Sequence, residues 1–286
     1  MIVEKNILGD AQVKKIIGYL IVMALLPAAY MVGCSESTAP SSPRGFGTKT
    51  PTKTVTRTIT LTRTITATPG ETATALPSQA NPAIVNLRTA ANYVVLAYSE
   101  VTNSGPSTLC GSLGLYPLAS VDGGIVIACG GVTDVANGAA NIAKQDLNTA
   151  YTDAAGRTGG AILPAGGDVG GSTFYHGLYT CGGDLLLSSA DLTLDGQGDS
   201  NAVFIIQVTG NLIVNPGRQV SLINSADAAK VFWQVTGYCS LDTTVAMVGN
   251  IMAYTSVTMN TGAVLVGRAL AENGNVTLLT NTITKP

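Results

Sequence analysis

Residues 239–278 read CSLDTTVAMVGNIMAYTSVTMNTGAVLVGRALAENGNVTL. A short triplet recurs in this stretch, and its middle residue is always Ser or Thr, which carries a hydroxyl group. Cys239-Ser240-Leu241 is followed after eighteen residues by Val257-Thr258-Met259, and after a further nineteen by Val276-Thr277-Leu278. Repeats of this length with short strands and turns are typical of β-solenoid coils, whose strands stack about 4.8 Å apart. Because side chains alternate along a strand, the outer residues of each triplet should point inward and the middle one outward.

Outside this stretch, residues 83–286 continue as short apolar strands separated by Gly, Asn and Asp. Such strands fit a sandwich, a barrel or a solenoid, and the repeats favour the solenoid. Residues 135–155 differ, because Ile142, Leu147, Ala150, Tyr151 and Ala154 follow a near-helical spacing and Gly156 provides a stop. One amphipathic helix against a β body is predicted. The clearest strands are expected at 93–97, 185–187, 190–194, 203–208, 211–214, 220–223, 230–235, 245–253, 257–259, 263–270 and 276–278.

The composition agrees with stacked strands and tight turns. Charged residues make up 11% of the chain, against about 25% in typical globular proteins, and there are 33 glycines. A net charge of -2 provides no basic field for phosphates, so no nucleic-acid partner is expected. After Ala80, seven basic residues stand against thirteen acidic ones, which marks the acidic part as the folded, soluble one.

The N-terminus has the pattern of an export signal. Lys14 and Lys15 precede an apolar run over residues 16–33, which ends at Cys34. Met31-Val32-Gly33-Cys34 resembles a bacterial lipobox, in which the cysteine is diacylated and becomes the mature N-terminus. Residues 1–34 are therefore predicted to be a signal segment with lipidation at Cys34. An uncleaved membrane anchor and a simple secretory signal are the alternatives, and each places the protein outside the cytoplasm as a membrane-anchored or secreted chain.

Residues 35–82 are rich in Thr, Ser and Pro. Thr occupies every even position from Thr48 to Thr68, and the intervening positions mix lysine and arginine with a few aliphatic residues. A strand of this composition has little to bury, so an extended linker is predicted, with strand pairing as the alternative. Thr/Pro-rich stalks are often O-glycosylated, and glycosylation of this linker is expected.

Four cysteines follow the lipobox: Cys110, Cys129, Cys181 and Cys239. An even number in an exported domain allows two disulfides with three possible pairings, and a pair 110–129 would close a cap loop. Cys239 falls at an inward position, so a buried thiol is the alternative to a 181–239 bond. No CxxC pair is present, which argues against zinc.

Other polar residues are interpreted as structural. Asp191, Asp195 and Asp199 surround a Gly-rich turn and could suggest calcium or a sugar-cleaving pair, but aspartates in such turns usually bond to nearby backbone. His176 is the only histidine, and no GxSxG motif accompanies it. No catalytic, metal or cofactor site is predicted.

Several motifs in order along residues 83–283 resemble one family. They are ANYVVLA at 91–97, VTNSGP at 101–106, DLNTAY at 146–151, LTLDGQGD at 192–199, VFWQV at 231–235 and GRALA at 267–271. This series resembles the microbial ice-binding proteins of cold-adapted bacteria, fungi and algae. The resemblance implies that residues 83–286 form a right-handed discontinuous β-helix of triangular section, with one long α-helix packed alongside.

The resemblance also implies a non-catalytic, monomeric protein that adsorbs to ice and inhibits its growth or recrystallisation. Family members bind ice through a flat face of outward side chains, and the segment 255–258 resembles the Thr-Ala/Gly-x-Thr/Asn motif of some of them. By alternation, Asn211, Ile213, Asp184 and Leu186 would join this face. The candidate residues are Ser99, Val101, Tyr238, Ser240, Thr255, Ser256, Thr258, Asn275 and Thr277.

Two rival functions use the same fold. A β-helical adhesin or structural surface protein would carry outward Thr and Ser only as ordinary solvent-facing strand residues. A polysaccharide-active enzyme would need converging carboxylates, and the sequence shows no such cluster. Fold alone does not choose between these functions.

Overall fold

A computed structural model describes residues 79–286. The predicted signal segment 1–34 with Cys34, and residues 35–78 of the predicted linker, lie outside the described residues. The described part is mostly β, with parallel strands and one long α-helix, as the sequence predicted. Its elements are η1 (Arg88–Asn92), β1 (Tyr93–Ala97), β2 (Glu100–Ser104), β3 (Ser107–Cys110), β4 (Ser112–Leu115), β5 (Ser120–Val121), β6 (Ile125–Ala128), β7 (Thr133–Val135), α2 (Gly138–Gly156), β8 (Ala161–Leu163), β9 (Gly167–Asp168), β10 (Thr173–Tyr175), β11 (Gly177–Cys181), β12 (Leu185–Leu187), β13 (Leu192–Asp195), β14 (Phe204–Val208), β15 (Leu212–Val214), β16 (Val220–Ile223), η2 (Ala228–Lys230), β17 (Val231–Val235), β18 (Cys239–Leu241), β19 (Ala246–Ala253), β20 (Val257–Met259), β21 (Val264–Ala271), β22 (Val276–Leu279) and β23 (Thr282–Thr284).

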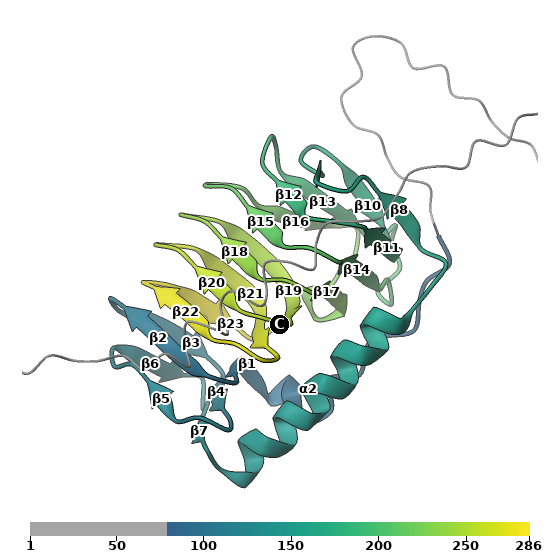
Figure 1. The fold of residues 1–286 in the computed structure, drawn as a ribbon. Coiled ribbons are helices and arrows are strands. Elements are labelled where there is room, and N and C mark those ends of the chain that lie inside the picture. Colours follow the sequence, from purple (N-terminus) through teal and green to yellow (C-terminus); the bar gives the residue numbers. More distant parts are fainter. Residues whose placement is uncertain (1–78) are drawn as a thin grey trace, which may run out of the picture. The chain divides into compact units, whose positions relative to one another are not determined.

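The strands form three sheets of twelve, eight and three strands, and from β8 to β23 successive strands of the chain enter different sheets. β11, β12 and β13 pair in turn with β14, β15 and β16, so each turn of the chain lies beside the next (Figure 1). The predicted repeat is confirmed: Cys239 pairs with Val257, and Val257 pairs with Val276. The eighteen- and nineteen-residue spacings therefore correspond to neighbouring coils.

The order of the coils in the stack differs from their order in the chain. β1 and β2 pair with β21 and β22, and β3 pairs with β23, so β22 lies between β20 and the early strand β2. α2 connects β7, beside the first coils, with β8 at the opposite end of the twelve-stranded sheet, and runs alongside the strands (Figure 1). The stack is thus discontinuous in sequence.

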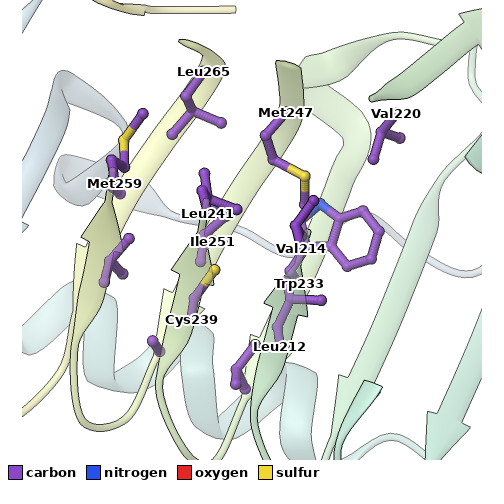
Figure 2. Close-up of a cluster of buried hydrophobic side chains, with 14 of the residues drawn as sticks. Leu212, Val214, Val220, Trp233, Cys239, Leu241, Met247, Ile251, Met259 and Leu265 are labelled. Atoms are coloured by element: carbon purple, nitrogen blue, oxygen red, sulfur yellow. The ribbon is translucent and has the colours of Figure 1, made fainter. Parts of the chain in front are cut away.

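The inward side chains of the coils form one hydrophobic core. Trp233 is its largest fully buried residue, and its Nε1 donates a hydrogen bond to the Val248 carbonyl oxygen at 2.9 Å. Figure 2 shows Trp233 among inward side chains from neighbouring coils, including Cys239, Met247 and Met259. The interpretation of Trp233 as a core residue is confirmed.

A second core cluster lies between α2 and the strands beneath it. Ala143, Leu147, Ala150 and Ala154 pack with buried residues of the strands, such as Phe232. The expected place of Ile142 on this stripe is wrong, because Ile142 is 54% exposed. Four of the six buried residues of α2 are alanines, and their small side chains allow the helix to lie close to the sheet.

The cysteines form one of the disulfides that the sequence allowed, and Cys239 is the buried thiol given as the alternative to a second bond. Cys110 and Cys129 form a disulfide with a Cα–Cα distance of 4.9 Å, whereas Cys181 and Cys239 are buried free thiols. Burial raises the pKa of the Cys239 thiol, which keeps it protonated and unreactive. No helix within residues 79–286 has the length and hydropathy needed to span a membrane.

Candidate functional site

The eight-stranded sheet carries the predicted face. Its order is β5-β2-β22-β20-β18-β15-β12-β9, and all of these strands are parallel. In β12, β15, β18 and β20 the first and third residues are buried and the middle residue is half-buried, as the alternation predicts. We call the outward side of this sheet the hydroxyl face. Its two rows of residues are Thr102, Thr277, Thr258, Ser240, Ile213 and Leu186, and Glu100, Asn275, Ser256, Tyr238, Asn211 and Asp184.

The first row is continuous in register from one end to the other. Thr102 lies beside Thr277, which lies beside Thr258, which lies beside Ser240. Ser240 is followed by Ile213, so the hydroxyl-bearing part of the row spans four adjacent strands. The Thr102 Oγ1 donates to the Thr277 Oγ1 at 2.9 Å, which holds these two side chains in one orientation.

The second row precedes the first by two residues on each strand. Asn275 donates its Nδ2 to the Thr277 Oγ1 at 3.0 Å, so the two rows are linked by a hydrogen bond. Further along, Asp184 Oδ1 accepts from both the backbone nitrogen and the Nδ2 of Asn211, at 2.7 and 3.0 Å. Asn211 Oδ1 in turn accepts from the backbone nitrogen of Tyr238 at 3.1 Å. These bonds fix the side chains from coil to coil.

The face is uneven in chemistry along its length. Small polar residues gather on β18, β20, β22 and β2, while Leu186 and Ile213 replace hydroxyls on β12 and β15. Tyr238 is exposed, and Glu100 brings a charge to the β2 end. Parallel strands lie about 4.8 Å apart, so the Ser and Thr side chains form a regular array only over these four coils.

One predicted face residue is wrong, and its neighbour takes the position. Val101 is fully buried, because it pairs with the inward Val276. The outward residues of β2 are therefore Glu100 and Thr102, and Ser99 is a half-buried residue before the strand whose backbone nitrogen donates to the Gly274 carbonyl. Aligning Val101-Thr102 with Val276-Thr277 reveals this register. Thr255 is exposed just before Ser256, outside the two rows.

A buried asparagine, Asn281, keeps the coils in register next to the face. Its Nδ2 donates to the carbonyl oxygens of Asn260 and Ala263 at 2.8 and 3.0 Å. Its backbone nitrogen donates to the Ser107 Oγ at 3.0 Å, and its Oδ1 accepts from the Leu279 nitrogen. One residue thus joins three coils at the turn that borders the face. A rigid backbone is what an array of side chains needs to keep a fixed spacing.

The three aspartates interpreted as structural accept hydrogen bonds from backbone nitrogens of their own turn or of the neighbouring coil. Asp195 Oδ1 accepts from the Gln197 nitrogen, and Asp199 Oδ1 accepts from the Asn201 nitrogen, both at 2.8 Å. Asp191 accepts from the Gln219 nitrogen. Within residues 79–286, no group of three or more His, Cys, Asp or Glu side chains has the arrangement of a metal site. The hydroxyl face presents its side chains as an extended array, which suits contact with an extended surface.

Comparison with known proteins identifies similar chains. The sequence model of a family described as ice-binding-like matches residues 95–284. An ice-binding protein of Colwellia sp is 33% identical over 223 residues, which cover 72% of this chain and 86% of that protein. An ice-binding protein of Nostoc sp. is 36% identical over 206 residues, with coverages of 70% and 74%.

Solved structures agree with the sequence comparisons. An ice-binding protein from an Antarctic biological consortium has a TM-score of 0.71 and 39% identity, covering 74% of this chain and 96% of that one. An ice-binding protein from the Antarctic ascomycete Antarctomyces psychrotrophicus has a TM-score of 0.66 and 29% identity, covering 71% and 98%. The similarity therefore extends over nearly the whole of both solved chains.

Proposed function

The chain belongs to the ice-binding-like family, and we propose that it binds ice through the hydroxyl face and catalyses no reaction. The observation that carries the proposal is the continuous row of Thr102, Thr277, Thr258 and Ser240 on four adjacent parallel strands. Relatives from Colwellia sp and Nostoc sp., which align with 72% and 70% of this chain, are ice-binding proteins. These relatives do not favour the alternative of an adhesin without ice affinity.

The proposed mechanism is adsorption to the surface of a crystal. Each Thr presents one methyl and one hydroxyl on a stiff β-branched side chain, so it orders water at a defined position with little loss of rotamer freedom. Contact of the methyl groups with the crystal releases water from their apolar surface, and the hydroxyl groups form hydrogen bonds to water molecules of the ice lattice. An adsorbed molecule curves the growing ice front between neighbouring molecules, which slows growth and recrystallisation.

We further propose the arrangement of the whole protein. The family resemblance supports a right-handed β-helix of triangular section that acts as a monomer. The apolar run 16–33 and the lipobox-like Cys34 support export and a membrane anchor, with residues 35–82 as a linker. Ice and the membrane would then be its two partners, on the extracellular side of the cell.

The proposed function is tested with tyrosine substitutions on the hydroxyl face. Thr258→Tyr and Asn275→Tyr place a bulky ring between neighbouring hydroxyls, so the face no longer fits a planar lattice. We expect both variants of the full chain to lose most of the thermal hysteresis and ice-recrystallisation inhibition of the parent. Thr193→Tyr is the matched control, because Thr193 is a half-buried residue of β13, whose strands are not part of the eight-stranded sheet that carries the hydroxyl face.

Circular dichroism and thermal unfolding of each variant check that the fold is retained. A parent chain without hysteresis or recrystallisation inhibition would refute ice binding. Equal losses in Thr193→Tyr and in the two face variants would refute the assignment of the face.

A further inference from the structure

A polar cleft lies between the N-terminal half of α2 and the segments that follow β1, β4 and β21. Its volume is about 490 Å³, within the range of about 300–1,000 Å³ that small-molecule sites occupy. Tyr98 follows β1, Tyr116 follows β4 and Glu272 follows β21, and all three residues line the cleft. None of the residues in the two rows of the hydroxyl face lines it, so the cleft is a separate feature of the molecule.

Two tyrosines form the strand side of the cleft. β1 pairs with both β21 and β4, so the segments after these three strands lie beside one another. The Tyr116 backbone nitrogen donates to the Ala97 carbonyl oxygen at 3.2 Å, which continues this pairing beyond the ends of the strands. Tyr98 is 39% exposed and Tyr116 is half-buried, so aromatic surface is available to a ligand on two neighbouring coils.

Amide side chains of α2 form the opposite side. Asn141, Gln145 and Asn148 follow one another at intervals of four and three residues, which places them on one face of the helix. Gln145 Nε2 donates to Asn141 Oδ1 at 3.1 Å, and Asn148 Nδ2 donates to Glu272 Oε1 at 3.0 Å. An amide group has two donor hydrogens and one acceptor oxygen, so these bonds leave donors and acceptors for a ligand.

The charges that line the cleft oppose each other. Within residues 79–286, Lys144 and Glu272 are the only charged residues on its wall, and Lys144 Nζ lies 3.8 Å from Glu272 Oε2. Lys144 Nζ donates to two backbone carbonyl oxygens instead, and it lies 5.8 Å from the centroid of the Tyr98 ring. Glu272 Oε2 is buried and has no hydrogen-bond donor among the described residues. The cleft thus carries no net charge but holds a carboxylate oxygen that lacks a donor.

We propose that this cleft binds a neutral saccharide. A sugar ring has a face of C–H groups, which packs on a tyrosine ring, and a rim of hydroxyl groups, which amides and a carboxylate bind. Asn148 is exposed, so rotation of its side chain gives a sugar hydroxyl access to the Glu272 carboxylate. A charged ligand finds no free counter-ion, because Lys144 and Glu272 already neutralise each other. The proposal does not depend on ice binding, since it concerns other residues.

Isothermal titration calorimetry of the full chain with neutral sugars tests this proposal. The probes are glucose, galactose, mannose, N-acetylglucosamine, cellobiose and chitobiose, and glucuronic acid is the charged counterpart of glucose. We expect at least one neutral sugar to bind at one site per chain, and glucuronic acid to bind more weakly than glucose. Tyr98→Ala removes a packing surface, and Glu272→Gln replaces a charged acceptor by a neutral one. Each should raise the Kd of the bound sugar about tenfold.

Gln145→Ala provides a variant that leaves the buried ion pair intact. Gln145 is an exposed helical residue, so its replacement by alanine should preserve the fold and still raise the Kd several-fold. Tyr238→Ala is the matched control for Tyr98→Ala, because Tyr238 is 41% exposed and does not line the cleft. It should keep the Kd of the parent. Circular dichroism and thermal unfolding of each variant exclude loss of fold as the cause.

The outcomes separate this proposal from the proposed function. A parent that binds none of the neutral sugars overturns the saccharide site, as does a parent that binds only glucuronic acid. Equal weakening by Tyr98→Ala and Tyr238→Ala also overturns it, because binding would then not occur in the cleft. We expect Tyr98→Ala to retain the thermal hysteresis of the parent. A parent that binds a sugar but shows no hysteresis retains the saccharide site and refutes ice binding.

Discussion

Lys144 shows how one buried side chain connects α2 to the coils. It is buried, and its Nζ donates to the carbonyl oxygens of Ala271 and Glu272 at 2.6 and 2.7 Å. The Glu272 Oε2 lies 3.8 Å away, and the Tyr98 ring centroid lies 5.8 Å away. Burial lowers the pKa of Lys144 to about 8, and the charge of Glu272 opposes this effect only in part.

The lowered pKa predicts how stability depends on pH. Above about pH 8 the folded chain has lost the Lys144 proton, while the unfolded chain keeps it up to the ordinary lysine pKa of 10.5. In this window the unfolded chain binds more protons, so the contribution of Lys144 to the free energy of unfolding rises with pH. Between pH 7.5 and 9.5 we expect a rise on the order of 2 kcal/mol in the parent relative to Lys144→Met.

Urea unfolding of the parent and of Lys144→Met at both pH values measures this difference. Subtracting the variant cancels the contributions of tyrosines, which titrate in both chains. A parent-minus-variant difference that stays constant from pH 7.5 to 9.5 would contradict the assignment to Lys144.

At the scale of the element, the sequence predicted the existence of α2 well. It predicted less well which side chains of the helix contact the strands. The expected range 135–155 compares with Gly138–Gly156, and Leu147, Ala150 and Ala154 are buried as expected. Ile142 is exposed because Ala143, next to it, faces the sheet. Hydrophobic spacing cannot distinguish these neighbours when the buried stripe consists mainly of alanines.

The first turn of α2 is held by a side-chain cap. Asn137 has an extended backbone, its Oδ1 accepts from the Ala140 nitrogen at 2.9 Å, and its Nδ2 donates to Asp134 Oδ1 at 2.7 Å. Asn137→Ala removes both bonds, so we expect the free energy of unfolding to fall by about 1 kcal/mol. Chemical denaturation measures this loss.

Asn141→Ala is the matched control for the cap. Asn141 lies in the first turn, and its side chain accepts from Gln145 Nε2 at the exposed surface. Because alanine also favours helix, this variant should keep the stability of the parent within about 0.5 kcal/mol. A loss in Asn141→Ala equal to that in Asn137→Ala would show that the cap is not the cause.

At the scale of the whole molecule, the proposed anchor concerns residues outside the described part of the chain. If Cys34 is diacylated, the chain partitions into membranes through its acyl groups. In a bacterium that processes lipoproteins, we expect Cys34→Ala to move the protein from the membrane fraction to the soluble or secreted fraction. Cell fractionation and labelling with radioactive palmitate measure the change.

Cys239→Ala is the matched control for the anchor, because Cys239 is a buried thiol far along the chain. It should retain both membrane association and palmitate labelling. Membrane association of Cys34→Ala without label would instead support an uncleaved apolar anchor over residues 16–33.

Local sequence alone specifies the stacked strands, the one helix and the outward positions of the regular coils. The strands expected at 93–97, 185–187, 220–223 and 257–259 agree with the structure residue for residue, because each is a short apolar run bounded by turn residues. The alternation of side chains placed Ser240, Thr258 and Thr277 in one row. These features are local, so the order of residue types along one strand decides them.

The folded chain was needed to establish which coils lie side by side and which surfaces they form. The C-terminal coil pairs with β1, β2 and β3. This pairing brings together residues that lie far apart in sequence, such as Thr102 and Thr277, which are separated by 175 positions. This pairing buries Val101 and brings Thr102 into the row of outward hydroxyl side chains. The physical reason is that strand register between distant segments is set by the packing of the common core, which no single segment contains.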